Sequence, residues 1–466
     1  MNTPKTFSLA LLLSSLGACA LQSEVPPLET TDVPATYSMA TDTAVAWPEL
    51  DWWQNFGDAE LSALIGQVQA NNLDLASSQR NLQVAQLTLR DAGFNLLPRA
   101  TLSAGAGIQY QESRIDGQQS DSNASPFDAI ASLSYNDILS KPAVYTQAIA
   151  DYDSRAAQVA DVTLTTLGTS ASTYFQLLLT RDKLAAAEQN VINAEAISEI
   201  VNARVEAGVA VPLEALQQQI ALQRERANLR SLQQNELAAR SSLALLTAQN
   251  VQAFNIGGDT LEAILVPEVA AGLPSELLLR RPDLVQAEAD LRSLVAGFDI
   301  ARSDYFPDIS LTASINASST SLSELISSPD MFINSSAALL QSVLDTGQRS
   351  RNVERSRLIM ESGLASYRRT VLAAFNEIEV LLSASQLQAE LVAVALQNLQ
   401  AAEEAFRIAQ VRYEEGVLDF QTVLNSQNTL FDSRNAYLDN KLQQLNTAVS
   451  LYQALGGGWQ ASDIPR

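Results

Sequence analysis

The fold is decided by one stretch of strict alternation, which reads Ile309-Ser310-Leu311-Thr312-Ala313-Ser314-Ile315-Asn316-Ala317-Ser318. Apolar and polar residues that alternate with a period of two indicate a β-strand with one apolar face and one polar face. A tilted strand needs about 9–11 residues to cross a bilayer. The sequence therefore predicts a membrane-crossing strand over 308–319, with apolar side chains toward lipid and polar side chains toward a lumen.

Three more segments carry weaker versions of this pattern. We predict strands at about 100–112, 126–138 and 331–345, with a polar loop over Asp116–Asn123 between the first two. The alternating apolar residues of the first two are Leu102, Ala104, Ala106, Ile108 and Tyr110, then Phe127, Ala129, Ala131, Leu133 and Tyr135. A soluble β-sandwich with one face on its core would show the same alternation and is the alternative.

Four strands cannot close a barrel by themselves. An open sheet edge in hydrocarbon leaves unpaired backbone groups, which cost several kcal/mol each. Other chains must therefore close the edges. Two copies would give eight strands and three would give twelve, and both are permissible even numbers for bacterial barrels.

The rest of the chain is predicted to be helical, and its sequence pattern occurs twice. Leu75, Leu82, Leu89 and Leu96 lie seven apart, and adding 209 to each number gives Leu284, Leu291, Phe298 and Tyr305. Further on, Arg204-Val205-Glu206-Ala207-Gly208-Val209 corresponds to Arg412-Tyr413-Glu414-Glu415-Gly416-Val417. Heptad spacing indicates coiled-coil-like helices, and the constant offset indicates two structural repeats.

Each repeat is expected to hold one very long helix flanked by shorter ones. The segment from Pro142 to Ala207 lacks further proline and predicts a helix on the order of 100 Å long. We expect shorter helices at 71–97 and 213–250, and the same pattern at 346–415 and 419–455. A structural rod without a pore is the alternative for the helices alone.

Composition excludes several classes of function. The net charge of −23 leaves no basic surface for a nucleic-acid backbone, so we expect no nucleic-acid partner. The chain has no histidine and a single cysteine, which removes histidine-based catalysis, Cys/His zinc sites and internal disulfides. We predict no enzymatic activity, no catalytic residues, no metal site and no cofactor. No run of about 18 apolar residues follows the N-terminal segment, so we expect no membrane-spanning helix.

The N-terminal segment has the layout of a secretory signal. Lys5 precedes the apolar run Phe7-Ser8-Leu9-Ala10-Leu11-Leu12-Leu13, and Leu16-Gly17-Ala18-Cys19 follows it. The last four residues look like a bacterial lipobox, which implies cleavage before Cys19 and a covalent lipid on its thiol. A plain secretory signal with an incidental cysteine is the alternative. Ala20 stands where an aspartate would resemble an inner-membrane retention signal, so the resemblance indicates the outer membrane.

We therefore divide the chain into five parts. Residues 1–18 form a lipoprotein signal peptide, and 19–57 form a tether that is rich in Pro, Thr, Ser and Asp. The first repeat spans 58–265 and the second 266–459. Residues 460–466 form a C-terminal tail.

Three further motifs carry a resemblance to a known family. They are Trp52-Trp53-Gln54-Asn55-Phe56-Gly57-Asp58, the run from Leu273 to Asp283 with Arg280-Arg281-Pro282-Asp283 at its end, and Ala454-Leu455-Gly456-Gly457-Gly458-Trp459. With the repeats and the lipobox, they resemble the TolC-like outer-membrane factors, in particular the NodT-type efflux lipoproteins. Taken by themselves, the second motif is a helix start and the third a glycine helix stop.

The resemblance implies an α+β fold of the TolC type. Three copies would share a twelve-stranded barrel in the outer membrane and a periplasmic barrel of long α-helices. The function implied is a passive exit duct for small molecules, a subunit of a tripartite efflux system. A periplasmic adaptor and an inner-membrane transporter would be the partners. A duct for protein secretion and a periplasmic structural lipoprotein without a pore are the alternatives. The sequence does not identify the cargo.

Functional residues are expected where the helices turn at the periplasmic end. By analogy with the family, Gly208-Val209 and Gly416-Val417 are the turns that meet the adaptor. The family often places an aspartate ring just inside the second turn, where this chain has the amides Gln421 and Asn425 and the nearest carboxylate is Asp419. We predict a periplasmic gate formed by these three residues, with less affinity for cations than an aspartate ring would have.

Overall fold

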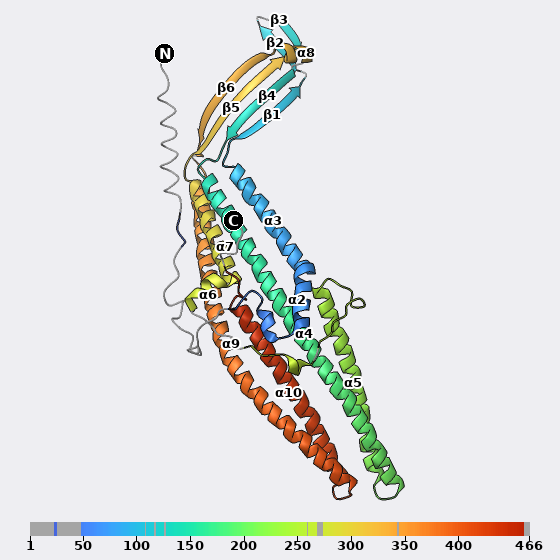
Figure 1. The fold of residues 1–466 in the computed structure, drawn as a ribbon. Coiled ribbons are helices and arrows are strands. Elements are labelled where there is room, and N and C mark those ends of the chain that lie inside the picture. Colours follow the sequence, from blue (N-terminus) through green and yellow to red (C-terminus); the bar gives the residue numbers. More distant parts are fainter. Residues whose placement is uncertain are drawn as a thin grey trace. The chain divides into compact units, whose positions relative to one another are not determined.

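The computed structural model describes residues 23–25, 48–107, 109–115, 118–124, 127–258, 260–267, 274–342 and 344–460. The short helix η2 (Trp52–Phe56) precedes the first repeat. The first repeat contains α2 (Ala59–Asn71), α3 (Leu73–Phe94), β1 (Arg99–Ala106), β2 (Gln109–Ile115), β3 (Gln118–Ala124), β4 (Phe127–Tyr135), α4 (Lys141–Glu206), α5 (Pro212–Leu246) and η3 (Leu261–Ala263) (Figure 1). The second contains α6 (Pro274–Arg280), α7 (Pro282–Ser303), β5 (Asp308–Ser319), α8 (Leu322–Ser327), β6 (Asp330–Leu340), α9 (Gln348–Glu414) and α10 (Phe420–Ala454) (Figure 1).

The lengths of corresponding helices agree with the two sequence repeats. Helices α3 and α7 both have 22 residues, and α5 and α10 both have 35. The long helices α4 and α9 have 66 and 67 residues. The heptad positions in α3 and α7 are buried or half-buried, as coiled-coil-like packing requires.

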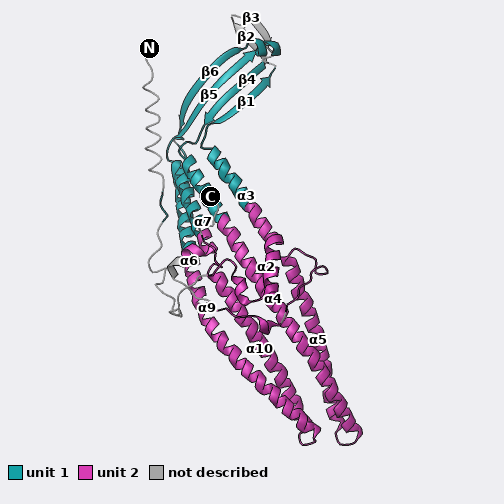
Figure 2. Cartoon of the chain, viewed as in Figure 1, with its two compact units in different colours: residues 1–27, 82–155, 287–367 teal, residues 28–81, 156–286, 368–466 magenta. Residues whose placement is uncertain are grey.

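The chain forms two compact units, and each unit combines segments of both repeats. Unit 1 comprises residues 1–27, 82–155 and 287–367, and unit 2 comprises 28–81, 156–286 and 368–466 (Figure 2). Unit 1 contains all the strands. Unit 2 contains the two turns that the sequence predicts to be functional, between α4 and α5 and between α9 and α10.

The strands of unit 1 form a four-stranded antiparallel sheet with the order β1-β4-β5-β6, and β2 pairs with β3 in a separate hairpin. The register places Leu102 opposite Ala131, Ala131 opposite Ile315, and Ile315 opposite Ile333. The two edge strands of the sheet are therefore β1 and β6. The strand predicted over 308–319 is confirmed at both ends by β5.

The other three strands differ from the prediction in their bounds. The strand expected over 100–112 is interrupted at Gly107, and its second half is the separate strand β2. The strands expected over 126–138 and 331–345 end earlier, at Tyr135 and Leu340. The loop expected over 116–123 was wrong, because β3 occupies most of it and pairs with β2 through backbone bonds that need no apolar alternation.

Unit 2 is built around an aromatic core that contains the Trp-Trp motif. The rings of Trp52 and Tyr452 stack at 5.1 Å, and those of Phe56 and Phe175 lie 5.2 Å apart. Asp58 caps α2 by accepting a hydrogen bond from the backbone N–H of Leu61. The motif therefore fixes the start of α2.

The other two motifs meet in unit 2 as well. Helix α7 begins at Pro282, and Arg281 binds both carboxylate oxygens of Asp283 at 2.9 and 2.7 Å. Arg281 also donates to Glu377 at 2.7 Å and to the carbonyl of Ala454, the last residue of α10. At Gly456, with φ of 86°, an added Cβ would lie 1.9 Å from the carbonyl oxygen of Arg280. These motifs thus join the start of α7 to the end of α10.

One helix has the length and the mean hydropathy that a membrane span requires. Within the described residues, α9 contains an 18-residue window with a mean hydropathy of 1.3, so its length and composition would allow it to cross a membrane. The window reaches this average although polar residues interrupt its apolar runs, and the expectation that no helix spans the membrane stays a prediction. Only 17% of this window is buried within the chain.

Candidate functional site

The four-stranded sheet of unit 1 has two chemically different faces. The cross-strand register places the following residues on one face: Ala100, Leu102, Ala104 and Ala106; Phe127, Ala129, Ala131, Leu133 and Tyr135; Ile309, Leu311, Ala313, Ile315 and Ala317; Met331, Ile333, Ser335, Ala337 and Leu339. The opposite face is rich in hydroxyl side chains. Thr101 and Ser132 hydrogen-bond across it at 2.7 Å. The alternation predicted from the sequence is therefore confirmed over the described strands.

Exposure shows which face is concave. On β4 and β5 the apolar-face residues Ala131, Leu133, Leu311 and Ile315 are exposed. Their polar-face neighbours Ser132, Ser134, Ser310 and Ser314 are half-buried. Side chains converge on the concave side of a curved sheet, so the lower exposure of the polar face in the middle of these strands favours that face as the concave one, although Thr312 on it is exposed. A sheet that is apolar outside and polar inside has the pattern of a membrane barrel, whereas a β-sandwich would bury its apolar face.

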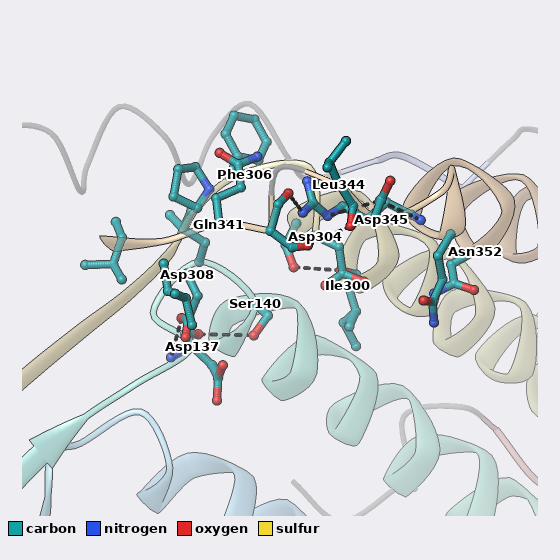
Figure 3. A pocket seen from close by; sticks show the side chains of 18 residues that line it. Asp137, Ser140, Ile300, Asp304, Phe306, Asp308, Gln341, Leu344, Asp345 and Asn352 are labelled. Atoms are coloured by element: carbon teal, nitrogen blue, oxygen red, sulfur yellow. Dashed lines mark hydrogen bonds and ion pairs between the residues drawn. The ribbon is translucent and has the colours of Figure 1, made fainter. Parts of the chain in front are cut away.

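A cavity of about 550 Å³ lies at the end of the sheet next to the helices of unit 1 (Figure 3). Asp137, Asp304, Asp308 and Asp345 line it. The backbone N–H of Asp137 donates to Asp308 at 3.3 Å, and Asp345 accepts from the N–H groups of Gly347 and Arg349. These two amides lower the pKa of Asp345. The described residues contain no group of three His, Cys, Asp or Glu side chains placed to hold a metal ion.

The two turns of unit 2 share one backbone design. Gly208 has φ of 73° and Gly416 has φ of 75°, values that glycine adopts without strain. The N–H of Val209 bonds to the carbonyl of Arg204, and the N–H of Val417 bonds to that of Arg412, each at 2.9 Å. This is the Schellman end of a helix. The predicted reversal at both glycines is therefore present in the structure.

A contact between the two repeats joins these turns. The guanidinium of Arg204 on α4 lies 4.8 Å from the ring centroid of Tyr413 on α9, and Arg204 Nη1 lies 3.5 Å from the Tyr413 carbonyl. The Tyr413 ring is 3% exposed and lies 5.8 Å from that of Phe420 on α10. Arg204 and Tyr413 were not predicted as functional residues. The only sequence signal was that each lies just before a turn glycine.

The three predicted gate residues lie at the start of α10. Asp419 caps this helix, and its carboxylate accepts from the N–H of Thr422 at 2.9 Å and from the Thr422 hydroxyl at 2.8 Å. The hydroxyl bond, followed by the N–H bond, lowers the pKa of Asp419. Gln421 donates its amide to Asn425 at 3.0 Å, one helical turn further on. The two amides thus form one exposed pair, and Asp419 is engaged as a helix cap.

The surface around the first turn is apolar and exposed. Val209, Val211, Leu213 and Leu216 are each more than half exposed. Val417 at the second turn is 73% exposed. Exposed apolar side chains clustered at the end of a helical hairpin are typical of a surface that another protein covers.

The predicted lipidation site, Cys19, lies outside the described residues. The nearest described residue, Ser23, is held on α7 within unit 1. Its N–H and hydroxyl donate to the two carboxylate oxygens of the buried Asp299 at 2.8 and 2.6 Å, and Arg302 donates to the Ser23 hydroxyl at 3.2 Å. Cys19 precedes Ser23 by four residues in the sequence.

Comparison with known proteins shows which proteins are similar to this chain. The family model described as outer membrane efflux protein matches residues 64–249 and 273–457. The chain is 32% identical to the pyoverdine export outer membrane protein OpmQ of Pseudomonas aeruginosa, over 98% of each chain. It is 28% identical to the toluene efflux pump outer membrane protein TtgC of Pseudomonas putida, over 98% of this chain and 96% of TtgC.

Solved structures show the same fold. The outer membrane channel CmeC of Campylobacter jejuni superposes with a TM-score of 0.89 at 21% identity, over 95% of this chain and 96% of CmeC. Long helical hairpins together with a sheet that has one apolar and one polar face define the class of TolC-like outer-membrane channels. The chain belongs to the outer membrane efflux protein family. Its α+β fold, outer-membrane location and role in efflux are as predicted, and the family is one of efflux proteins rather than of enzymes.

Proposed function

We propose that this chain is one third of a passive exit duct, through which an inner-membrane transporter expels small molecules by way of a periplasmic adaptor. The observation that carries the proposal is the sheet with a convex apolar face and a concave face rich in hydroxyl groups. Such a sheet covers only a sector of a barrel. Its strands alternate in direction, so β6 of one copy can pair antiparallel with β1 of the next.

Three copies, rather than two, follow from the resemblance to TolC-like channels. Twelve strands would close the barrel and remove both open edges from the hydrocarbon. The low burial of the apolar window in α9 supports the same assembly, because a neighbouring copy would cover it. OpmQ is named for pyoverdine export and TtgC for toluene efflux, so small molecules of different polarity are the cargo class that we propose here.

The exposed valines and leucines at the first turn, together with Val417, are proposed to meet the adaptor. The periplasmic gate is proposed to lie at Asp419, Gln421 and Asn425. Because Gln421 and Asn425 are neutral and bonded to each other, three copies would not repel one another as carboxylates do. The proposed anchor is a lipid on Cys19. The bond between Ser23 and Asp299 supports it by holding the chain within reach of the sheet's helix end.

Planar-bilayer recordings of the purified, full-length protein test this proposal. We expect discrete, non-rectifying conductance steps without an added energy source, and a mass in detergent equal to three chains. A structural lipoprotein without a pore would give no steps. Palmitate incorporation that is lost in Cys19→Ala tests the anchor separately.

The gate is tested by a gain of function. In Gln421→Asp/Asn425→Asp, we expect a block by millimolar magnesium added from the periplasmic side, whereas the wild-type channel stays open. A matched control, Gln400→Asp at an exposed position of α9, should behave as wild type. Equal magnesium block of the wild type and the double variant would contradict the gate assignment.

A further inference from the structure

The concave face of the sheet is not uniformly polar. Its residues form rows across the four strands. From the helix end outward, the complete rows are Arg99, Ser134, Thr312 and Ser336; Thr101, Ser132, Ser314 and Asn334; Ser103, Ile130, Asn316 and Phe332; Gly105, Asp128, Ser318 and Asp330. Only β5 and β6 extend further toward the helix end. The paired residues there are Ser310 with Ala338 and Asp308 with Leu340.

Large apolar side chains enter the complete rows at one level only. Ile130 on β4 and Phe332 on β6 flank Asn316 on β5, and the Phe332 ring is 60% exposed. Neighbouring strands lie about 4.8 Å apart, so these two side chains lie on alternate strands about 10 Å apart. An exposed phenylalanine on a face of serines, threonines and asparagines serves no packing purpose within the chain.

The next row outward is acidic. Asp128 and Asp330 lie two residues before Ile130 and Phe332 on the same strands, one row further from the helix end, and neither has a large apolar neighbour across its own row. Gly105 lies opposite Asp128, and a Cβ added there would come within 2.6 Å of the Asp128 carboxylate. The absence of a side chain at Gly105 thus leaves room for this carboxylate on the concave face.

We infer that Ile130 and Phe332 form an apolar constriction in the lumen of the barrel and determine which solutes pass. The inference rests on the proposed function, because it requires the concave face to enclose the lumen. Twelve strands with a spacing of about 4.8 Å and a tilt of about 40° close a ring of about 12 Å radius. Three phenylalanines and three isoleucines pointing into such a ring fill much of its cross-section.

The chemistry of the constriction follows from hydration. Water and strongly hydrated ions cross this level at a cost, because Ile130 and Phe332 offer no hydrogen bonds in place of the hydration shell and only Ser103 and Asn316 of the same row can do so. Weakly hydrated organic solutes lose less hydration free energy, and they gain contact with the phenylalanine rings. The pair therefore favours apolar and weakly hydrated solutes over small, strongly hydrated ones. The acidic row beyond it favours cations over anions at the same end.

Bilayer recordings of full-length variants test this inference. Phe332→Ser and Ile130→Ser should each raise the conductance in potassium chloride, and Phe332→Ser should at least double it. The permeability of tetraethylammonium relative to potassium should fall in both. Phe332→Leu keeps the site apolar and should retain the tetraethylammonium preference. The matched control is Ile333→Ser, which lies on the opposite face of the same strand and is 78% exposed.

The outcomes separate this inference from the proposed function. If the wild-type protein gives no channels, the proposed function fails. If it gives channels but Phe332→Ser and Ile130→Ser leave the conductance and the permeability ratio unchanged, the constriction is refuted and the duct stands. If Ile333→Ser changes the conductance of inserted channels and Phe332→Ser does not, the two faces have been assigned the wrong way round and the inference is overturned.

Discussion

The two helical turns of unit 2 have the same backbone and different support. Both end in a glycine with φ near 75° and the same pair of hydrogen bonds. The second turn leads into α10, which has a capping aspartate and fourteen buried residues. The first leads into α5, which has the same length, no side-chain cap at Val211 and four buried residues. The second turn is therefore held by its own chain, and the first leaves apolar surface for another molecule.

The largest effect on stability is expected at Tyr413, and it tests whether the second turn is held by its own chain. Tyr413→Ala removes a buried ring that packs between Arg204 and Phe420, and large-to-small changes of this kind cost about 3–5 kcal/mol. Val209→Ala at the exposed first turn should change stability by less than about 0.5 kcal/mol. Thermal unfolding of both variants in detergent checks the difference.

Tyr413→Phe is the control for that experiment. The Tyr413 hydroxyl is buried without a hydrogen-bond partner among the described residues. Its removal should therefore leave stability unchanged or slightly raised. A loss as large as that of Tyr413→Ala would show that the hydroxyl, rather than the ring, holds the turn.

The turn glycines should respond equally, because the backbone is what the turns share. A Cβ at Gly208 or Gly416 meets no atom within 4 Å, so only the left-handed conformation opposes it. Gly208→Ala and Gly416→Ala should each cost about 1–2 kcal/mol. Equal shifts of the thermal midpoint are expected. A shift at one glycine alone would mean that the two turns differ in backbone after all.

The cap at Asp419 should give a smaller, pH-dependent effect. Its pKa is lowered in the folded chain, so its contribution is present above about pH 4, near the unfolded value, and is lost as the pH falls through the folded pKa. Asp419→Ala should lower the thermal midpoint at pH 7, and the two midpoints should converge in acid. A midpoint difference that stays constant down to pH 2 would exclude this role.

The smallest effect is expected from giving the first turn the cap that it lacks. Val211→Ser would place a hydroxyl three residues before Glu214, which is the pattern of a capping box. We expect a gain of about 0.5–1 kcal/mol, measured as slower hydrogen exchange in the first turn of α5. Unchanged exchange would indicate that the first turn is already held as firmly as the second.

Much of this fold can be predicted from the sequence, because period and spacing are local signals. The strand predicted at about 308–319 is β5, and the repeat offset predicted the same order of helices in both repeats. Helix α8 was missed although its signal was present, since Ser321 caps it three residues before Glu324. The β2–β3 hairpin was missed because most of its paired residues are polar and β3 shows no apolar alternation.

The site was predicted less completely than the fold. The turn glycines could be predicted because a few adjacent residues specify where a helix ends. The contact between Arg204 and Tyr413 could not, because these residues lie 209 positions apart and nothing local indicates which helices are neighbours. Likewise, Phe332 could be assigned to a face only once the register of β6 was known, since its strand has the weakest alternation.

The central claim is that the sheet faces lipid on one side and water on the other. Nitroxide labels on cysteines at Leu311 and Thr312, neighbours on β5, test it most directly in lipid vesicles. We predict that the Leu311 label collides with dissolved oxygen and is shielded from a water-soluble nickel chelate, and that the Thr312 label shows the reverse. Equal access of the chelate to both labels would contradict the account.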